Sequence, residues 1–268
     1  GVRMCYTKGS MARTKANHSP LKIAMIGAKG LQVRQDSGGI ERHVEQLATR
    51  LARKGHDVLC YVRPRFTSTR ESVWNGVHLE RMPSIPTKNL DTITHVFLST
   101  ISVLFKDIDV IHYHGVGPAT LAWIPRLFKP RARIIVTVHS IDRLHQKWGF
   151  FARTYLRFGE WAAIRFPHKT ICVSRSLQQY FADVYGARIE YIPNGAVVGN
   201  YPGSDALARW GLAKHGYLLT VARLIKLKGI HHLVAAYAKL ETDKTLVIVG
   251  TSPLGSEYAD ELRQLSAG

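Results

Sequence analysis

Short apolar runs that alternate with amphipathic stretches constrain the fold of this chain more than any other feature of its sequence. The first run, residues 21–26, stops at Gly27, as a strand buried on both faces of a parallel sheet does. The stretch that follows places apolar side chains on one face of a helix, and Gly55 marks its end. The residues of that face are Ile40, Val44, Leu47, Ala48 and Leu51.

The same alternation continues along the chain. Further runs typical of strands are 58–62, 77–82, 110–113, 133–138, 170–173 and 189–192. Stretches typical of helices are 91–105, 118–128, 150–166 and 176–184. Strand–helix–strand alternation requires right-handed crossovers, so it predicts an α/β fold with a doubly wound parallel sheet. Seven strands predict one complete Rossmann-like domain over residues 21–193.

The remaining segments complete the expected organisation. Residues 1–20 contain four basic residues, no acid and no apolar period, and we expect a disordered basic tail. Residues 194–204 are rich in Gly, Pro and Asn and predict a linker. Residues 205–268 begin a second α/β unit of 64 residues, fewer than the roughly 100–150 of a typical domain. We therefore expect a second Rossmann-like domain that is incomplete.

The charge balance indicates an anionic partner. The formal net charge is +18, which suits nucleic acid, an acidic membrane surface or phosphorylated ligands. Residues 126–169 hold ten basic and two acidic residues, with Trp148, Phe150, Phe151 and Trp161 among them. This mixture is typical of a membrane interface or of stacking on bases. A solvated helix face beside core aromatics explains it equally well, and both interpretations stay open.

Cysteine content and apolar runs indicate a location. The three cysteines, Cys5, Cys60 and Cys172, form no Cys-x-x-Cys pair, which argues against a disulfide scaffold or a zinc ribbon and fits a reducing cytosol. Residues 1–20 lack the apolar core of a signal peptide, and the longest uncharged apolar stretch, residues 92–105, is shorter than the roughly 20 residues of a spanning helix. We expect a cytoplasmic protein that crosses no membrane.

The first candidate site combines Gly27 and Gly30 with Gly38 and Gly39, ahead of the first predicted helix. Glycine lets a backbone approach a bulky anion, and a helix N-terminus offers free N–H groups. The spacing is not Gly-x-Gly-x-x-Gly, and no acid follows where a dinucleotide ribose needs one. An ordinary helix-starting loop remains the alternative.

The second candidate site is a set of histidines after two strands, His112 and His114 on one and His139 on the other. Ligands of open α/β sheets bind beyond the carboxyl ends of strands, so we expect His114 and His139 in one crevice. His112 and His114 share a strand face, but no third metal ligand is evident, and we expect no bound metal. Hydrogen-bonded histidines at strand ends remain the alternative.

The third candidate site is a basic pair, Arg223 and Lys228, between a predicted strand and a helix. Arginine offers phosphate a fork of donors and lysine a compact charge, and the helix N-terminus adds its dipole. The pair suits a diphosphate, although the pattern alone equally fits a solvated loop.

Six segments together resemble the GT-B glycosyltransferases of family 4, from about Leu21 to the end of the chain. The closest likeness is to bacterial enzymes that build capsule, exopolysaccharide or lipopolysaccharide chains. The segments are GGIERHVEQLATRLARKGHDV at 38–58, DVIHYHG at 109–115, IIVTVHSID at 134–142, TICVSRSLQQYF at 170–181, YIPNG at 191–195 and VARLIKLKGIHHLV at 221–234.

The resemblance implies two Rossmann-like domains and a nucleotide-sugar donor held mainly by the second. It implies glycosyl transfer with retained anomeric configuration, without metal or other cofactor. Arg223 and Lys228 match the R-x4-K pair that neutralises the departing diphosphate, where fixed cations favour the transition state. Gly38 and Gly39 match the loop that approaches donor and acceptor, and His139 matches the histidine near the reacting sugar. His114 is expected on the acceptor side, with Asn194 there or in the interdomain turn.

One departure from the family pattern limits these expectations. The E-x7-E motif, which holds the donor sugar and ribose, has no match before Gly268, and Glu257 and Glu261 are only four apart. We expect a fragment of a longer hexosyl- or deoxyhexosyltransferase whose own activity is in doubt. Acceptors in such pathways are commonly lipid-linked and anionic, which predicts peripheral binding to the inner face of the plasma membrane.

Three alternatives stay open. A nucleic-acid-binding protein fits the charge, but no RRM, KH, helix-turn-helix or zinc-finger pattern accompanies it. A sugar-nucleotide epimerase shares the architecture but needs cleft carboxylates for which there is no matching pattern. A non-catalytic anion-binding α/β protein is the third. The sequence does not choose among UDP, GDP and dTDP, and it leaves the acceptor and the oligomeric state open.

Overall fold

The computed structural model describes residues 19–31, 38–87, 90–144, 149–196, 205–252 and 257–266. Nearly all of the predicted tail, at residues 1–20, and residues 197–204 of the predicted linker lie outside this part of the chain. The chain divides into two compact units, Gly1–Gly195 and Ala196–Gly268, and each is described by itself.

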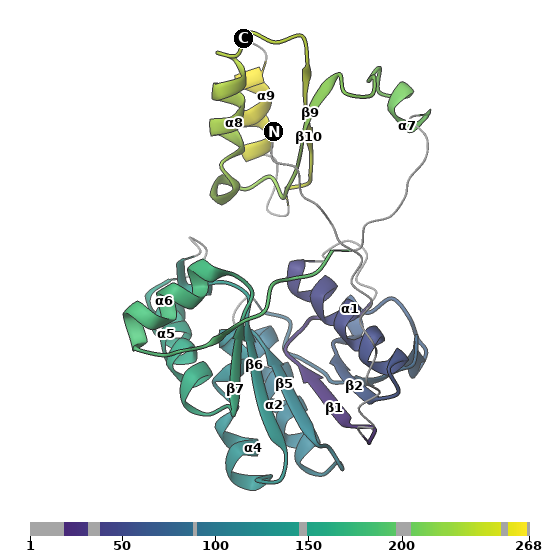
Figure 1. Cartoon of the computed structure of the whole chain (residues 1–268), viewed down its shortest axis with the longest axis vertical. Coiled ribbons are helices and arrows are strands. Elements are labelled where there is room, and N and C mark those ends of the chain that lie inside the picture. The colour runs from purple at the N-terminus through teal and green to yellow at the C-terminus, as the bar shows by residue number, and fades with distance from the viewer. Residues whose placement is uncertain are drawn as a thin grey trace, which may run out of the picture. The chain divides into compact units, whose positions relative to one another are not determined.

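The first unit is built on one eight-stranded sheet in the order β3-β4-β2-β1-β5-β6-β7-β8. Figure 1 shows β2, β1, β5, β6 and β7 side by side in this order. All neighbouring strands pair in parallel except β3 and β4. The chain reverses its direction of winding between β1 and β5, as in doubly wound folds. The strands are β1 (Lys22–Ile26), β2 (Asp57–Val62), β3 (Val73–Trp74), β4 (Val77–Arg81), β5 (Val110–His114), β6 (Arg133–Val138), β7 (Lys169–Cys172) and β8 (Glu190–Tyr191).

The predicted α/β fold with a doubly wound sheet is confirmed, with two local corrections. The sheet has eight strands rather than seven, because Asn75 and Gly76 both take positive φ angles and turn β3 back onto β4. An Asn-Gly pair is the usual residue choice for such a tight hairpin. The single helix expected at 118–128 is two helices separated by a turn at residues 120–122.

Helices cover both faces of the sheet. The helices of this unit are α1 (Gly39–Arg53), α2 (Leu90–Leu104), α3 (Val116–Ala119), α4 (Trp123–Phe128), α5 (Phe150–Arg165) and α6 (Arg175–Tyr185). Met25 of β1 packs in the cluster that contains Val44 of α1, whereas Ala24 packs with Val96 of α2. Because successive side chains of a strand point to opposite faces, β1 is apolar throughout and buried from both sides.

The second unit contains a parallel pair of strands, β9 (Tyr217–Val221) and β10 (Thr245–Val249), with helices α7 (Asp205–Ala208), α8 (Ile230–Tyr237) and α9 (Glu257–Ser266). Ile230 and Val234 of α8 pack against Tyr258 and Leu262 of α9 to form its core. Within the described part of the chain, no helix is both long and apolar enough to span a bilayer.

Candidate functional site

The candidate site lies where β1 and β5 end, at the point of the sheet where the winding reverses. Gly27 follows β1 with a φ of +115°, and a Cβ atom there would come within 2.7 Å of the carbonyl oxygen of His114. Only glycine therefore lets the loop after β1 approach the end of β5 this closely. Open α/β sheets bind their ligands at such a point.

Four histidines meet at this edge of the sheet: His43 of α1, His112 and His114 of β5, and His139 directly after β6. We call them the histidine cluster. The ring centroid of His43 lies 4.9 Å from that of His139 and 5.6 Å from that of His114. His114 Nδ1 lies 3.4 Å from His139 Nε2. The predicted meeting of His114 and His139 thus holds within this unit, and α1 adds a third ring.

Burial keeps the imidazoles of the cluster neutral. It lowers the pKa of His112 to about 3 and that of His139 to about 4, with neighbouring histidines adding to both shifts. The pKa of His114 also falls well below its usual value, and that of His43 falls because its burial outweighs a hydrogen bond with Asn194. Desolvation penalises a charged ring. His139 therefore offers a polar, uncharged ring to a ligand.

The two predicted glycines lie at the N-terminus of α1, and they differ in their surroundings. The N–H of Gly38 donates to Glu41 Oε2 at 2.9 Å, so a carboxylate of the same helix already satisfies it. A Cβ at Gly39 would meet no atom of the described residues within 4 Å. Gly39 is therefore the position that leaves open space at this helix end.

An ion pair between a partly exposed arginine and a fully buried carboxylate restrains the segment that follows His139. Arg143 Nε donates to Glu160 Oε1 at 3.0 Å, and the carboxylate of Glu160 is fully buried in α5. Tyr180 and Tyr185 of α6 donate their hydroxyls to Glu160 Oε2 at 2.7 and 2.8 Å. One carboxylate thus joins the segment after β6 to two helices, which restrains the path of the chain away from His139.

The predicted diphosphate pair lies in the second unit, between β9 and α8. Arg223 and Lys228 are both exposed, and Lys228 lies one residue before Gly229, the N-cap of α8. Lys226, between them, pairs with Glu261 at 3.3 Å. For the described part of this unit, no ion pair is recorded for Arg223 or Lys228, so both cations face solvent.

Two residues of this site were missed by the sequence analysis. His43 occupies an inward-facing helix position, three residues after Ile40 and one before Val44. A polar ring at such a position among apolar neighbours indicates a candidate site residue. Glu160 is one of only two acids in the basic stretch 126–169, and its burial depends on partners distant in sequence.

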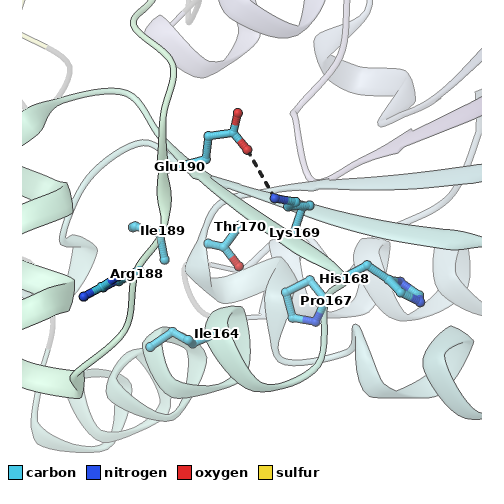
Figure 2. Close-up of a pocket in the computed structure, with 8 residues that line it drawn as sticks. All are labelled: Ile164, Pro167, His168, Lys169, Thr170, Arg188, Ile189 and Glu190. Atoms are coloured by element: carbon cyan, nitrogen blue, oxygen red, sulfur yellow. Dashed lines mark ion pairs between the residues drawn. The ribbon is translucent and has the colours of Figure 1, made fainter.

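A hollow of about 430 Å³ lies elsewhere in the first unit, and Figure 2 shows its lining. Lys169 and Glu190 form an ion pair at 3.7 Å on its rim, and Arg188 also lines it. Lys169 starts β7, so the hollow lies at the amino ends of strands, opposite the histidine cluster. No predicted site residue lines it, and we place the functional site at the carboxyl edge.

Comparison with known proteins identifies the family of the chain. Residues 37–198, more than half of the chain, match the model of Glycosyltransferase Family 4. The glycogen synthase of Mycobacterium tuberculosis is 25% identical over 260 residues, which cover 85% of this chain and 61% of that protein. The chain thus spans less than two thirds of the length of this curated relative.

Solved structures share the fold at low sequence identity. Sucrose-phosphate synthase from Thermosynechococcus elongatus is 21% identical with a TM-score of 0.68, over 92% of this chain and 68% of that one. Anabaena Alr3699/HepE, in complex with UDP and glucose, is 20% identical with a TM-score of 0.66, over 92% and 66%. The catalytic domain of starch synthase IV from Arabidopsis thaliana, bound to ADP and acarbose, is 17% identical with a TM-score of 0.65, over 92% and 71%.

Proposed function

The chain belongs to glycosyltransferase family 4, and from that premise we propose that it transfers a hexosyl or deoxyhexosyl group from a nucleotide-diphosphate sugar to a saccharide acceptor. The observation that carries the proposal is the packing of His139 against His43 of α1, at the carboxyl edge of the sheet. This places a neutral ring close to the helix whose first residue, Gly39, leaves open space.

The donor is held by cations of the second unit. Arg223 and Lys228 are exposed beside the N-terminus of α8, where a diphosphate gains both charge and free backbone donors. Structural neighbours in complex with UDP and with ADP support a nucleotide donor. Negative charge grows on the diphosphate as it departs, so these cations stabilise the transition state more than the ground state.

The reaction proceeds with retention of configuration and without a metal ion in the transfer step. The bond from the anomeric carbon to the diphosphate oxygen breaks, and an acceptor hydroxyl forms the new glycosidic bond on the same face. The hydroxyl proton passes to the departing phosphate oxygen. His139 contacts the reacting sugar and orients a hydroxyl through its neutral ring, while His114 and Asn194 line the acceptor side.

The acceptor is lipid-linked, and the enzyme works on the inner face of the plasma membrane in cell-surface polysaccharide synthesis. The outer face of α5 supports this part of the proposal. Phe150 and Phe151 are 79% and 88% exposed, and Phe158 and Trp161 continue the same side of the helix. Arg153, Arg157 and Arg165 are exposed among them. Exposed aromatics with basic neighbours suit the headgroup region of an anionic leaflet.

Calorimetry tests the donor site directly. UDP, GDP, ADP and dTDP are titrated into the wild type and into the Arg223→Ala/Lys228→Ala double variant. We expect one nucleotide to bind at micromolar affinity and the double variant to lose that binding. Lys226→Ala is the matched control, because it removes a cation of the same loop that is already paired with Glu261. Equal binding by all three proteins would contradict the assignment of the diphosphate site.

Transfer is then tested with the matching sugar nucleotide and lipid-linked saccharides, in the presence of a chelator. We expect His139→Ala to abolish turnover while nucleotide binding by the second unit persists. Nucleotide binding without any transfer would favour the alternative of a non-catalytic anion-binding protein.

A further inference from the structure

The histidine cluster contains a geometry that glycosyl transfer does not require. His43, His114 and His139 each offer one ring nitrogen, and these three atoms all lie within 4.8 Å of one another. His114 Nδ1 and His139 Nε2 are 3.4 Å apart. Two nitrogens bound to one tetrahedral ion at 2.0–2.1 Å are separated by about 3.3 Å. The spacing is long for an N–H···N hydrogen bond but matches that of two ligands of one ion.

An unsatisfied nitrogen of His43 points to a missing partner. The Nε2 atom of His43 is buried and has no hydrogen-bond partner among the described residues. A buried polar atom without a partner costs about 1–3 kcal/mol, so such atoms indicate that something else binds there. A metal ion bound to Nε2 of His43 accepts the lone pair of this atom and removes this cost.

Asn194 prepares His43 to act as a ligand. His43 Nδ1 lies 2.8 Å from Asn194 Oδ1, and because a carbonyl oxygen only accepts, Nδ1 must carry the proton. The lone pair of the ring is then on Nε2, the atom without a partner. A hydrogen bond from the other ring nitrogen to an oxygen is the usual support of a metal-binding histidine.

We propose that His43, His114 and His139 form a site for a divalent transition-metal ion, with Zn²⁺ as its expected occupant. Three imidazoles without a carboxylate select zinc, copper or nickel over magnesium or calcium. Three protein ligands leave a fourth position for water.

Occupancy of the site regulates the enzyme. This step rests on the proposed function. An ion bound to His139 occupies the lone pair that would otherwise accept a hydrogen bond from the sugar. Zinc therefore inhibits glycosyl transfer. The inhibition is reversed by a chelator, and metal-free protein is the active form.

The test is a zinc titration of chelator-treated full-length protein in competition with a chromophoric chelator, without nucleotide or sugar. We expect one high-affinity zinc per chain in the wild type, and at least a tenfold loss of affinity in His43→Ala and in His139→Ala. Both positions are partly exposed, which favours folded variants, and circular dichroism checks this. Co²⁺ is a second probe, whose visible spectrum reports tetrahedral nitrogen coordination.

His231→Ala/His232→Ala is the matched control, because it removes two adjacent histidines whose rings lie 3.9 Å apart in the second unit. We expect this double variant to bind zinc like the wild type. Equal affinities of the wild type, His43→Ala and His139→Ala would overturn the proposal, as would loss of binding in the control. Zinc binding without measurable transfer would instead overturn the proposed function and leave the metal site standing.

Discussion

The Nδ1 atom of His43 lies 2.8 Å from the Oδ1 atom of Asn194, and this contact joins α1 to a segment 151 residues further along the chain. Asn194 lies just beyond β8, one edge strand of the sheet, whereas α1 contacts β2 and β4 near the other edge. The side chain that orients a ring of the histidine cluster is thus supplied from a distant part of the unit.

Replacing Asn194 by Ala should weaken zinc binding several-fold with little loss of stability. The exposed hydrogen bond contributes about 1 kcal/mol or less to folding, but it sets the proton position on His43. Asn194→Asp keeps an acceptor at the same place and should retain wild-type affinity or exceed it. Competition titrations and urea denaturation measure both quantities. A larger loss of affinity in Asn194→Asp than in Asn194→Ala would contradict this role.

Replacing Glu160 by Gln should lower the free energy of unfolding by about 3 kcal/mol. The change removes the buried negative charge that accepts hydrogen bonds from Arg143, Tyr180 and Tyr185, and a hydrogen bond to a charged group contributes about 1.5–3 kcal/mol. Glu190→Gln is the matched control, since its pair with Lys169 is exposed and worth about 0–1 kcal/mol. Urea denaturation compares the two, and similar losses would refute the special role of Glu160.

Replacing Gly39 by Ala should preserve stability and reduce transfer about tenfold. A Cβ at this position meets no atom of the part of the chain that the structure describes, and alanine is the better helix former by up to about 1 kcal/mol. A donor or acceptor bound at this helix end would meet the added methyl group. Gly27→Ala, in contrast, should lose about 2 kcal/mol or more, because its φ is +115° and the methyl group would strike His114. Thermal unfolding and initial rates test both; undiminished transfer by Gly39→Ala would place the ligand elsewhere.

Acid should destabilise the first unit partly through His95, which is fully buried beside the Arg63–Asp91 ion pair. Burial, followed by the charge of Arg63, lowers the pKa of His95 from 6.5 to about 4. Below pH 6.5 the unfolded chain binds a proton that the folded state excludes until about pH 4. The free energy of unfolding therefore keeps its full value above pH 6.5. It decreases as the pH falls towards 4, by about 3 kcal/mol in total.

His95→Gln removes this titration, so its loss of stability between pH 7 and pH 4 should be smaller than that of the wild type. Denaturation at pH 8 is the control, because at this pH neither the folded nor the unfolded state of either protein carries the His95 proton. Parallel pH profiles of the two proteins would show that His95 does not titrate as expected.

Replacing Phe150 and Phe151 by Ser should weaken binding to vesicles that contain phosphatidylglycerol. Both rings are exposed on the outer face of α5, and insertion into the headgroup region is their expected role. Phe128→Ser is the matched control, an exposed aromatic at the end of α4. Flotation at low salt measures the change. Equal effects of both variants, or no vesicle binding by the wild type, would remove the membrane proposal.

Most of the secondary structure could be predicted because its signals are local. The period of apolar side chains identified the strands and helices of the sheet, and Gly27 and Gly55 marked two ends. The extra strand β3 was not predicted, because two residues are too few to show a period. The pair Asn75-Gly76 is nevertheless typical of the tight turn that follows it. Residues 118–128 have one helical period, but a turn at residues 120–122 separates α3 from α4.

The sequence predicted the doubly wound sheet of the first unit and the meeting of His114 and His139 at one edge, because both lie at the ends of strands of a parallel sheet. It did not reveal that His43 completes a group of three rings or that Asn194 and Glu160 support this group, which the folded chain shows. These contacts depend on the packing of α1 against the sheet and on partners far apart in sequence. Periodicity records which face of an element is buried, but it does not record which residue of another element will lie opposite.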